Sequence, residues 1–137
     1  MTVKLLDRRA VVTGGASGIG EAIAVGFAQE GVDVAILDTN ETKPVAVVKR
    51  AESLGRKGSF SRCDVGDAGQ VGSAFTEVGQ RLGGIDILVN NAGIIRLSPI
   101  VDMPEDEWDL ILCTNLKIAF LCSMDWSLPQ GAEFGKE

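Results

Sequence analysis

A glycine-rich stretch near the amino terminus, Thr13-Gly14-Gly15-Ala16-Ser17-Gly18-Ile19-Gly20, constrains the fold of this chain more than any other segment. It follows the apolar run 10–12 and opens a segment in which apolar residues recur at helical spacing. A strand that turns through glycines into a helix can hold phosphate, because the first helical turn offers unpaired N–H groups and a positive dipole end. Glycine also lets the backbone approach a pyrophosphate that a Cβ atom would hold off. The stretch therefore predicts a phosphate-binding turn.

Strand-like and helix-like segments alternate along the rest of the chain. Short apolar runs predict strands at 10–12, 32–37, 57–63 and 85–89, the last of them covered on both faces. Helical spacing predicts helices from the glycine-rich stretch to Gly31, at 42–54, from Asp67 to Leu82 and at 104–122. This α/β order implies a parallel sheet with right-handed crossovers, and a dinucleotide-type winding gives it the strand order 3-2-1-4. The chain would supply both walls of the central cleft, but only about half of a full doubly wound sheet.

Composition narrows the classes of partner. The net charge of −6 argues against nucleic acid, whose phosphates need a basic surface. Apolar runs fall short of the roughly 18 residues that a membrane-spanning helix needs, so no membrane segment is expected. Three widely spaced cysteines predict reduced thiols in a cytoplasmic protein. The chain contains no histidine, which excludes histidine metal sites and histidine acid–base chemistry, and no metal site is predicted.

Polar or glycine residues follow each predicted strand at its carboxyl end. After the glycine-rich stretch come Asp38, then Asp64-Val65, then Asn90-Asn91-Ala92-Gly93. Because the carboxyl ends of parallel strands meet at one edge of a sheet, these four groups should converge on one ligand. That convergence is more specific than any single motif.

Asp38 stands twenty residues after Gly18, the spacing of an acid that binds the ribose hydroxyls of adenosine. The alternative is an aspartate that only shapes the turn after its strand. A carboxylate at this position would repel a 2′-phosphate, and neither Ser17 nor Thr39 is a cation that could offset the repulsion. The sequence therefore favours NAD over NADP.

The later strand ends have both binding and structural interpretations. Asp64 could accept a hydrogen bond from the adenine amino group or form an Asx turn, and Val65 would line the pocket. In Asn90-Asn91-Ala92-Gly93 the small residues allow close packing beside a cofactor, and the asparagines can tie the strand end to its neighbours. For Asn91, a purely structural role and direct contact both stay open.

Together these motifs resemble the short-chain dehydrogenase/reductase family. Residues 13–20, Asp64-Val65, Asn90-Asn91-Ala92-Gly93 and Asn115-Leu116-Lys117 match the family pattern in order and spacing, and the likeness covers residues 3–122. It implies a Rossmann fold and hydride transfer between NAD(P)(H) and an alcohol or carbonyl. By the same likeness, the pyrophosphate lies on Gly14, Ser17, Gly18, Ile19 and Gly20. The adenosine half lies on Asp38, Asp64, Val65 and Asn90, and the small residues Ala92 and Gly93 are expected to pack beside the cofactor.

Asn115 matches the catalytic asparagine of the family, which holds a water in a proton relay through a local helix distortion. It lies in the apolar stripe Trp108, Ile111, Leu112, Ala119 and Cys122 of the predicted last helix. A buried asparagine must find hydrogen-bond partners or carry a cost of about 1–3 kcal/mol. The alternative is therefore a core asparagine that only bonds neighbouring backbone.

The family's tyrosine general acid/base, with its lysine and serine, has no counterpart here, because the sequence contains no tyrosine. We therefore expect residues 1–122 to be the amino-terminal part of a dehydrogenase domain, inactive alone, and 123–137 to be a tail outside the family pattern. The alternative is a non-catalytic NAD(H)-binding module that competes with a full-length partner. Another Rossmann class, such as a methyltransferase, fits the combined motifs poorly. The uncovered fourth strand predicts weak folding or association, so a homo-oligomer stays open.

Overall fold

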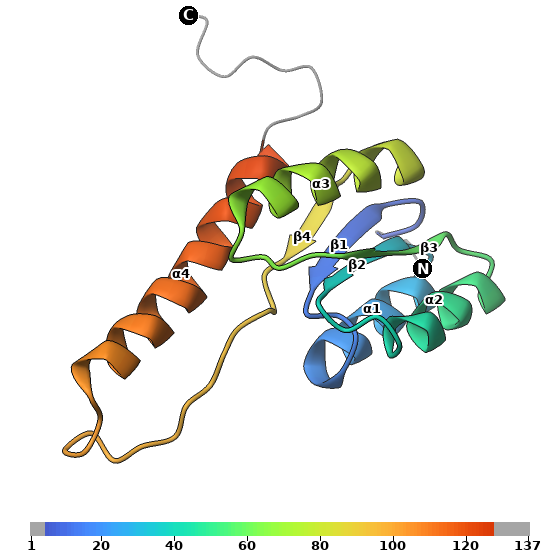
Figure 1. Cartoon of the computed structure of the whole chain (residues 1–137). Helices are drawn as coiled ribbons and strands as arrows, with labels where there is room; N and C mark the ends of the chain where they lie inside the picture. Colours follow the sequence, from blue (N-terminus) through green and yellow to red (C-terminus); the bar gives the residue numbers. More distant parts are fainter. Residues whose placement is uncertain (1–4, 128–137) are drawn as a thin grey trace, which may run out of the picture.

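The computed structural model describes residues 5–127 and contains one four-stranded sheet flanked by four helices (Figure 1). All strand pairs are parallel, in the order β3-β2-β1-β4, which confirms the predicted topology. The strands are β1 Arg9–Thr13, β2 Asp33–Asp38, β3 Gly58–Arg62 and β4 Ile87–Val89. The helices are α1 Gly18–Gln29, α2 Pro44–Ser53, α3 Ala68–Leu82 and α4 Glu105–Ser127.

The helices form two layers, with α1 and α2 on one face of the sheet and α3 and α4 on the other (Figure 1). Alternation along the strands separates the two cores. Val11 and Leu37 pack with α3 and α4, through Phe75 and Leu121 among others. Val12 and Ile36 point to the other face and pack with α1 and α2. Because successive strand residues face opposite sides, a run that is apolar throughout must lie in the middle of a three-layer sandwich.

The fourth strand is shorter and less covered than predicted. β4 spans Ile87–Val89, and all three residues are half-buried, whereas Val11 and Val12 of β1 are fully buried. Leu88 packs against the core under α3 and α4, and Ile87 and Val89 pack against the cores on the other face, so the strand is covered on both faces but less completely than predicted. Among the described residues β4 pairs only with β1, so its second edge has no strand beside it.

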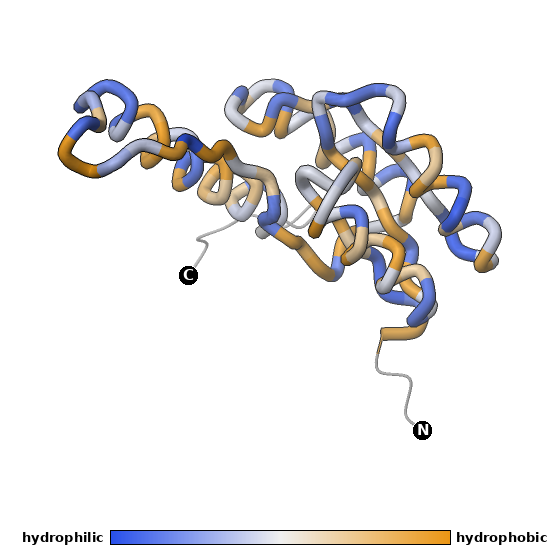
Figure 2. The backbone as a smooth tube through the Cα atoms, turned by 90° about the horizontal axis from the view of Figure 1, so that it is seen from below, coloured by the Kyte–Doolittle hydropathy of each residue, from blue (hydrophilic) through white to orange (hydrophobic). Residues whose placement is uncertain are grey.

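The last helix also differs from the prediction. α4 runs to Ser127, beyond the expected end at Cys122; residues 128–137 of the predicted tail lie outside the described residues. Its buried residues are Ile118, Leu121 and Cys122, whereas Trp108 and Leu112 of the predicted stripe are exposed. The predicted stripe fails because the first half of α4 and the loop before it extend away from the sheet, as the arm with apolar segments in Figure 2 shows. None of the helices described here is long and apolar enough to span a membrane.

An ion pair joins the beginnings of two adjacent strands. Asp86 accepts hydrogen bonds from the backbone N–H and the Nε of Arg9 at 2.9 Å each, and from a terminal guanidinium nitrogen at 3.0 Å. The same guanidinium donates to the carbonyl of Gly83. The hydrogen bond from the Arg9 side chain is the main reason that the pKa of Asp86 lies below its usual value. This pair ties the first residue of β1 to the residue that precedes β4.

We expect Asp86→Asn to lower the free energy of unfolding by about 1–2 kcal/mol at pH 7, because three charge-assisted hydrogen bonds weaken. Since folding lowers the pKa of Asp86, its stabilisation is present above the unfolded value of about 3.9 and is lost as pH falls through the folded pKa. Urea unfolding from pH 7 to pH 2 should show the two proteins converging in acid. Asp109→Asn, on the exposed part of α4, is the control, and an equal loss there would contradict the assignment.

Candidate functional site

A cavity of about 400 Å³ opens at the carboxyl edge of the sheet. Residues that follow all four strands line it, together with two residues of α4. They are Gly14 and Ser17; Leu37, Asp38 and Thr39; Cys63, Asp64, Val65 and Gly66; Asn91, Ala92, Gly93 and Ile94; and Thr114 and Ile118. The predicted site residues Gly14, Ser17, Asp38, Asp64, Val65, Ala92 and Gly93 are thus brought together. Gly18, Ile19, Gly20, Asn90 and Asn115 are not among the lining residues.

The glycine-rich turn has the geometry of an anion cradle. Gly14 and Gly18 adopt φ of +64° and +58°, a backbone conformation that glycine tolerates and other residues rarely adopt. A Cβ atom on Gly18 would meet no other atom within 4 Å, so the turn faces open space at this point. Ser17 caps α1 in an extended conformation, and its hydroxyl makes no capping hydrogen bond. The N–H groups of the first helical turn are therefore available to a ligand.

Gly20 serves the packing of this turn. A Cβ atom on Gly20 would lie 2.5 Å from Asn91 Nδ2 and closer still to the carbonyl oxygen of Gly14. Gly20 itself is buried, at the point where α1 passes the ends of β1 and β4. The absence of a side chain here is what lets the helix start directly above the two strands, so Gly20 shapes the cradle from inside the protein.

Thr13 and Asn91 join the end of β1 to the end of β4. Thr13, only 2% exposed, accepts hydrogen bonds at Oγ1 from the backbone N–H groups of Asn91 and Ala92 at 3.1 and 3.0 Å. The same hydroxyl donates to the Val89 carbonyl at 3.2 Å. In return, Asn91 Nδ2 donates to the carbonyl oxygens of Thr13 and Gly14 at 3.0 and 3.1 Å. These bonds support the structural role of Asn91, and direct contact with a cofactor stays a prediction, because Asn91 also lines the cavity.

Thr13 was missed as a site residue, because a threonine at a strand end gives no signal of its own. Two features of the sequence could have indicated its role: Thr13 directly precedes the first glycine, and Asn91 follows the fourth predicted strand.

Asp38 and Asp64 both face the cavity and both shape their own loops. Asp38 accepts hydrogen bonds from the N–H groups of Ala16 at 3.1 Å and Asn40 at 2.9 Å. Asp64 Oδ1 accepts from the Gly66 N–H at 2.9 Å, which is the predicted Asx turn. A carboxylate has about four lone-pair sites, so each of these groups retains capacity for a ligand.

Asn115 and Asn90 hold the segments beside the cavity. Asn115 Oδ1 accepts from the Ile94 N–H at 2.8 Å, and its Nδ2 donates to the Ile94 carbonyl at 3.0 Å. This reciprocal pair fastens the chain after β4 onto α4, which is the alternative stated for a core asparagine. α4 is assigned as α-helix across Asn115. The catalytic role implied by the family likeness stays a prediction. Asn90 Nδ2 donates to Ser123 Oγ at 3.1 Å.

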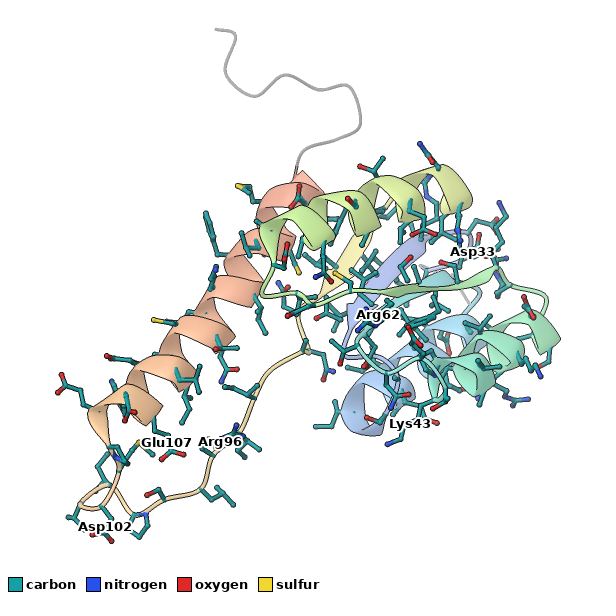
Figure 3. The ribbon with its side chains drawn as sticks, in the orientation of Figure 1. Asp33, Lys43, Arg62, Arg96, Asp102 and Glu107 are labelled. Atoms are coloured by element: carbon teal, nitrogen blue, oxygen red, sulfur yellow. The ribbon has the colours of Figure 1, made fainter. Side chains whose placement is uncertain are left out.

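Titratable and charged side chains lie near the cavity. Burial, with a smaller contribution from Asp64, raises the pKa of Cys63 to about 11, so the thiol in the cavity wall is neutral at pH 7. Arg62 and Lys43 lie toward this edge, whereas Asp33 lies at the opposite end of the sheet (Figure 3). Arg62 pairs with Glu41 at 3.3 Å. No acidic, cysteine or histidine cluster able to hold a metal ion occurs within residues 5–127.

Comparison with known proteins finds a family match over most of the chain. A family model described as short chain dehydrogenase matches residues 8–128. The chain is 40% identical over 113 residues to a 3beta-hydroxysteroid dehydrogenase of Mediterraneibacter gnavus, covering 82% of this chain and 41% of that protein. It is 39% identical over 124 residues to a 3-oxoacyl-(acyl-carrier-protein) reductase of Chlamydia pneumoniae, covering 90% and 50% respectively. The chain therefore spans about half the length of the curated relatives it matches.

Solved structures agree with this result. A short-chain type dehydrogenase/reductase from Mycobacterium marinum superposes with a TM-score of 0.85 at 34% identity, covering 93% of this chain and 53% of that one. A short chain dehydrogenase from Burkholderia cenocepacia, in complex with NADP, gives 0.84 at 39% identity with the same coverage. An NAD+-bound xylitol dehydrogenase gives 0.84 at 30% identity, covering 90% and 48%.

Proposed function

The chain belongs to the short-chain dehydrogenase family, and we propose that it binds a nicotinamide dinucleotide, NAD(H) rather than NADP(H), at the carboxyl edge of its sheet. One observation carries the proposal: the segments after all four strands meet in a single cavity, with Gly14, Asp38, Asp64 and Ala92 in its wall. In an open parallel sheet this edge, between β1 and β4, is the switch point at which ligands bind.

The residues present fit such a cofactor. The glycine-rich turn and the free N–H groups at the start of α1 suit a pyrophosphate, and the Asp38 carboxylate suits ribose hydroxyls. Val65 and Ile118 offer apolar contact for a ring, beside the Asp64 carboxylate. When bound, a nicotinamide group supplies hydride transfer. The protein's part is to hold and orient the cofactor.

The preference for NAD(H) rests on charge. The Asp38 carboxylate lies beside Thr39 in the cavity wall. Arg62, which lies toward this edge of the sheet, forms an ion pair with Glu41. A 2′-phosphate near Asp38 would therefore meet like charge. We expect calorimetric titration to give NADH a dissociation constant about tenfold lower than NADPH, equivalent to about 1.4 kcal/mol. Equal affinities would contradict the preference, and no heat with either at millimolar concentration would contradict the binding function.

We further propose that the 137-residue chain does not transfer hydride by itself, because it contains no tyrosine, the residue that serves as general acid/base in the family pattern. Purified chain mixed with NAD and a panel of secondary alcohols should give no absorbance increase at the NADH wavelength above the rate without protein. A full-length relative in the same assay is the positive control. A steady NAD-dependent oxidation by the chain would show that another group carries the proton.

For a full-length dehydrogenase that contains this chain, we propose a small alcohol or carbonyl compound as the substrate. The cytoplasmic location proposed for the chain is supported by its cysteines, since Cys63, Cys113 and Cys122 are all free thiols.

We also propose that copies of the chain associate. Three large apolar side chains of α4 are exposed to solvent: Trp108 at 46%, Leu116 at 68% and Phe120 at 63%.

A further inference from the structure

We propose that Asp38 is a positioning residue for the glycine-rich turn, separate from any contact that it makes with a cofactor. The inference deepens the proposed NAD(H) function and rests on it for the consequence in binding. The structural part, that Asp38 holds the turn in place, stands on contacts within the free chain.

The contact spans two strand ends. Asp38 is the last residue of β2, and Ala16 belongs to the turn between β1 and α1. Asp38 Oδ2 accepts from the Ala16 N–H at 3.1 Å, while Oδ1 accepts from the Asn40 N–H at 2.9 Å. Ala16 is 3% exposed, so water has little access to replace the carboxylate. One side chain therefore fastens the glycine-rich turn to the loop after β2.

The place of Ala16 gives this hydrogen bond its effect. Ala16 immediately precedes Ser17, the residue that caps α1, and the open N–H groups of the first helical turn come next. The orientation of the Ala16 peptide sets the direction in which the chain enters the helix. Holding that peptide therefore keeps the anion-binding N–H groups arranged before any ligand arrives, which lowers the ordering cost of binding.

Charge and hydrogen bonding make opposite predictions, and this separates the two roles of Asp38. The carboxylate places a negative charge near the anion cradle, so loss of the charge alone should strengthen binding of an anion that has no ribose. Loss of the hydrogen bond to Ala16 should weaken binding of the same anion. Asp38→Asn removes the charge and keeps one oxygen, which can accept from the Ala16 N–H, while the hydrogen bond from the Asn40 N–H is lost. Asp38→Ala removes both.

The experiment compares these two variants, which have equal charge, with inorganic pyrophosphate as the probe. Calorimetric titration should show pyrophosphate binding to Asp38→Asn about fivefold more tightly than to Asp38→Ala. By NMR, the Ala16 amide of the ligand-free chain should exchange with solvent about tenfold faster in Asp38→Ala than in the unmodified chain, relative to core amides such as Val11. Thr42→Ala, which alters the loop after β2 without touching Ala16, should leave Ala16 exchange unchanged.

Equal pyrophosphate affinity in the two Asp38 variants would overturn the inference, and so would unchanged Ala16 exchange in Asp38→Ala. If the unmodified chain binds neither pyrophosphate nor NADH, the proposed function fails. The exchange rate of Ala16 then still decides whether Asp38 holds the turn.

Discussion

Replacing Thr13 by valine is expected to lower the free energy of unfolding by about 2–3 kcal/mol, although the two side chains have nearly the same shape. The Thr13 hydroxyl is buried and accepts the N–H groups of Asn91 and Ala92. The Asn91 N–H also donates to the Val89 carbonyl at 3.0 Å, so the Ala92 N–H is the donor left without an acceptor. Ala92 is half-buried in the cavity wall, so this N–H is partly desolvated and has no protein acceptor in the variant.

Thermal unfolding followed by circular dichroism should show Tm lower by roughly 8–12 °C in this variant. Ala92 lines the cavity, so NADH affinity should fall as well. Thr13→Ser is the matched control, because it keeps the oxygen and removes only a methyl group. The serine variant should retain most of the stability. If valine and serine cost the same, packing of the methyl group rather than the hydroxyl would hold the strand ends together.

The sheet could be predicted from the sequence because its signals are local and repeated. Four short apolar runs, each ended by a polar or glycine residue and separated by helical segments, leave few windings that satisfy right-handed crossover. The predicted start of a helix at Asp67 is likewise confirmed: Asp67 caps α3, and its side chain accepts a hydrogen bond from the Gln70 N–H at 3.0 Å. That contact is the main reason that the pKa of Asp67 is lowered.

What the sequence did not reveal depends on contacts between distant residues. Thr13 and Asn91 are 78 positions apart, and each alone is an ordinary polar residue at a strand end. Asn115 looked like a member of an apolar stripe, yet its partner is the backbone of Ile94, which no periodicity could indicate. The choice between a binding and a structural role needed the partner atoms.

Helix α4 shows why periodicity misled at the carboxyl end. Apolar residues occur on two sides of this helix: Ile118, Leu121 and Cys122 face the core, whereas Leu112, Leu116 and Phe120 are exposed. With apolar residues on opposite sides, no single stripe stands out, and a buried face cannot be chosen from spacing alone. Leu116 and Phe120, together with Trp108, form the surface on which association of this chain is proposed.

Gly20→Ala is the second change from which we expect a large effect, a loss of about 3 kcal/mol in the free energy of unfolding together with loss of measurable NADH binding. The added methyl would lie 2.5 Å from Asn91 Nδ2 and closer to the Gly14 carbonyl oxygen. The Gly14 oxygen belongs to the backbone, and the Asn91 side chain is held by two hydrogen bonds, so moving either atom would cost free energy. The start of α1 must therefore move away from the strand ends, which opens the cradle.

Gly26→Ala in the same helix separates this clash from the general effect of replacing a helical glycine. A Cβ atom on Gly26 would meet no other atom within 4 Å, so alanine there should raise stability by about 0.5–1 kcal/mol through its better helix propensity. Urea unfolding of the two variants should therefore give shifts of opposite sign. If Gly20→Ala were neutral or stabilising like Gly26→Ala, α1 would not be held against Asn91 and Gly14. The binding turn would then be free to rearrange, and the geometry on which the proposed cofactor site depends would not be fixed by the fold.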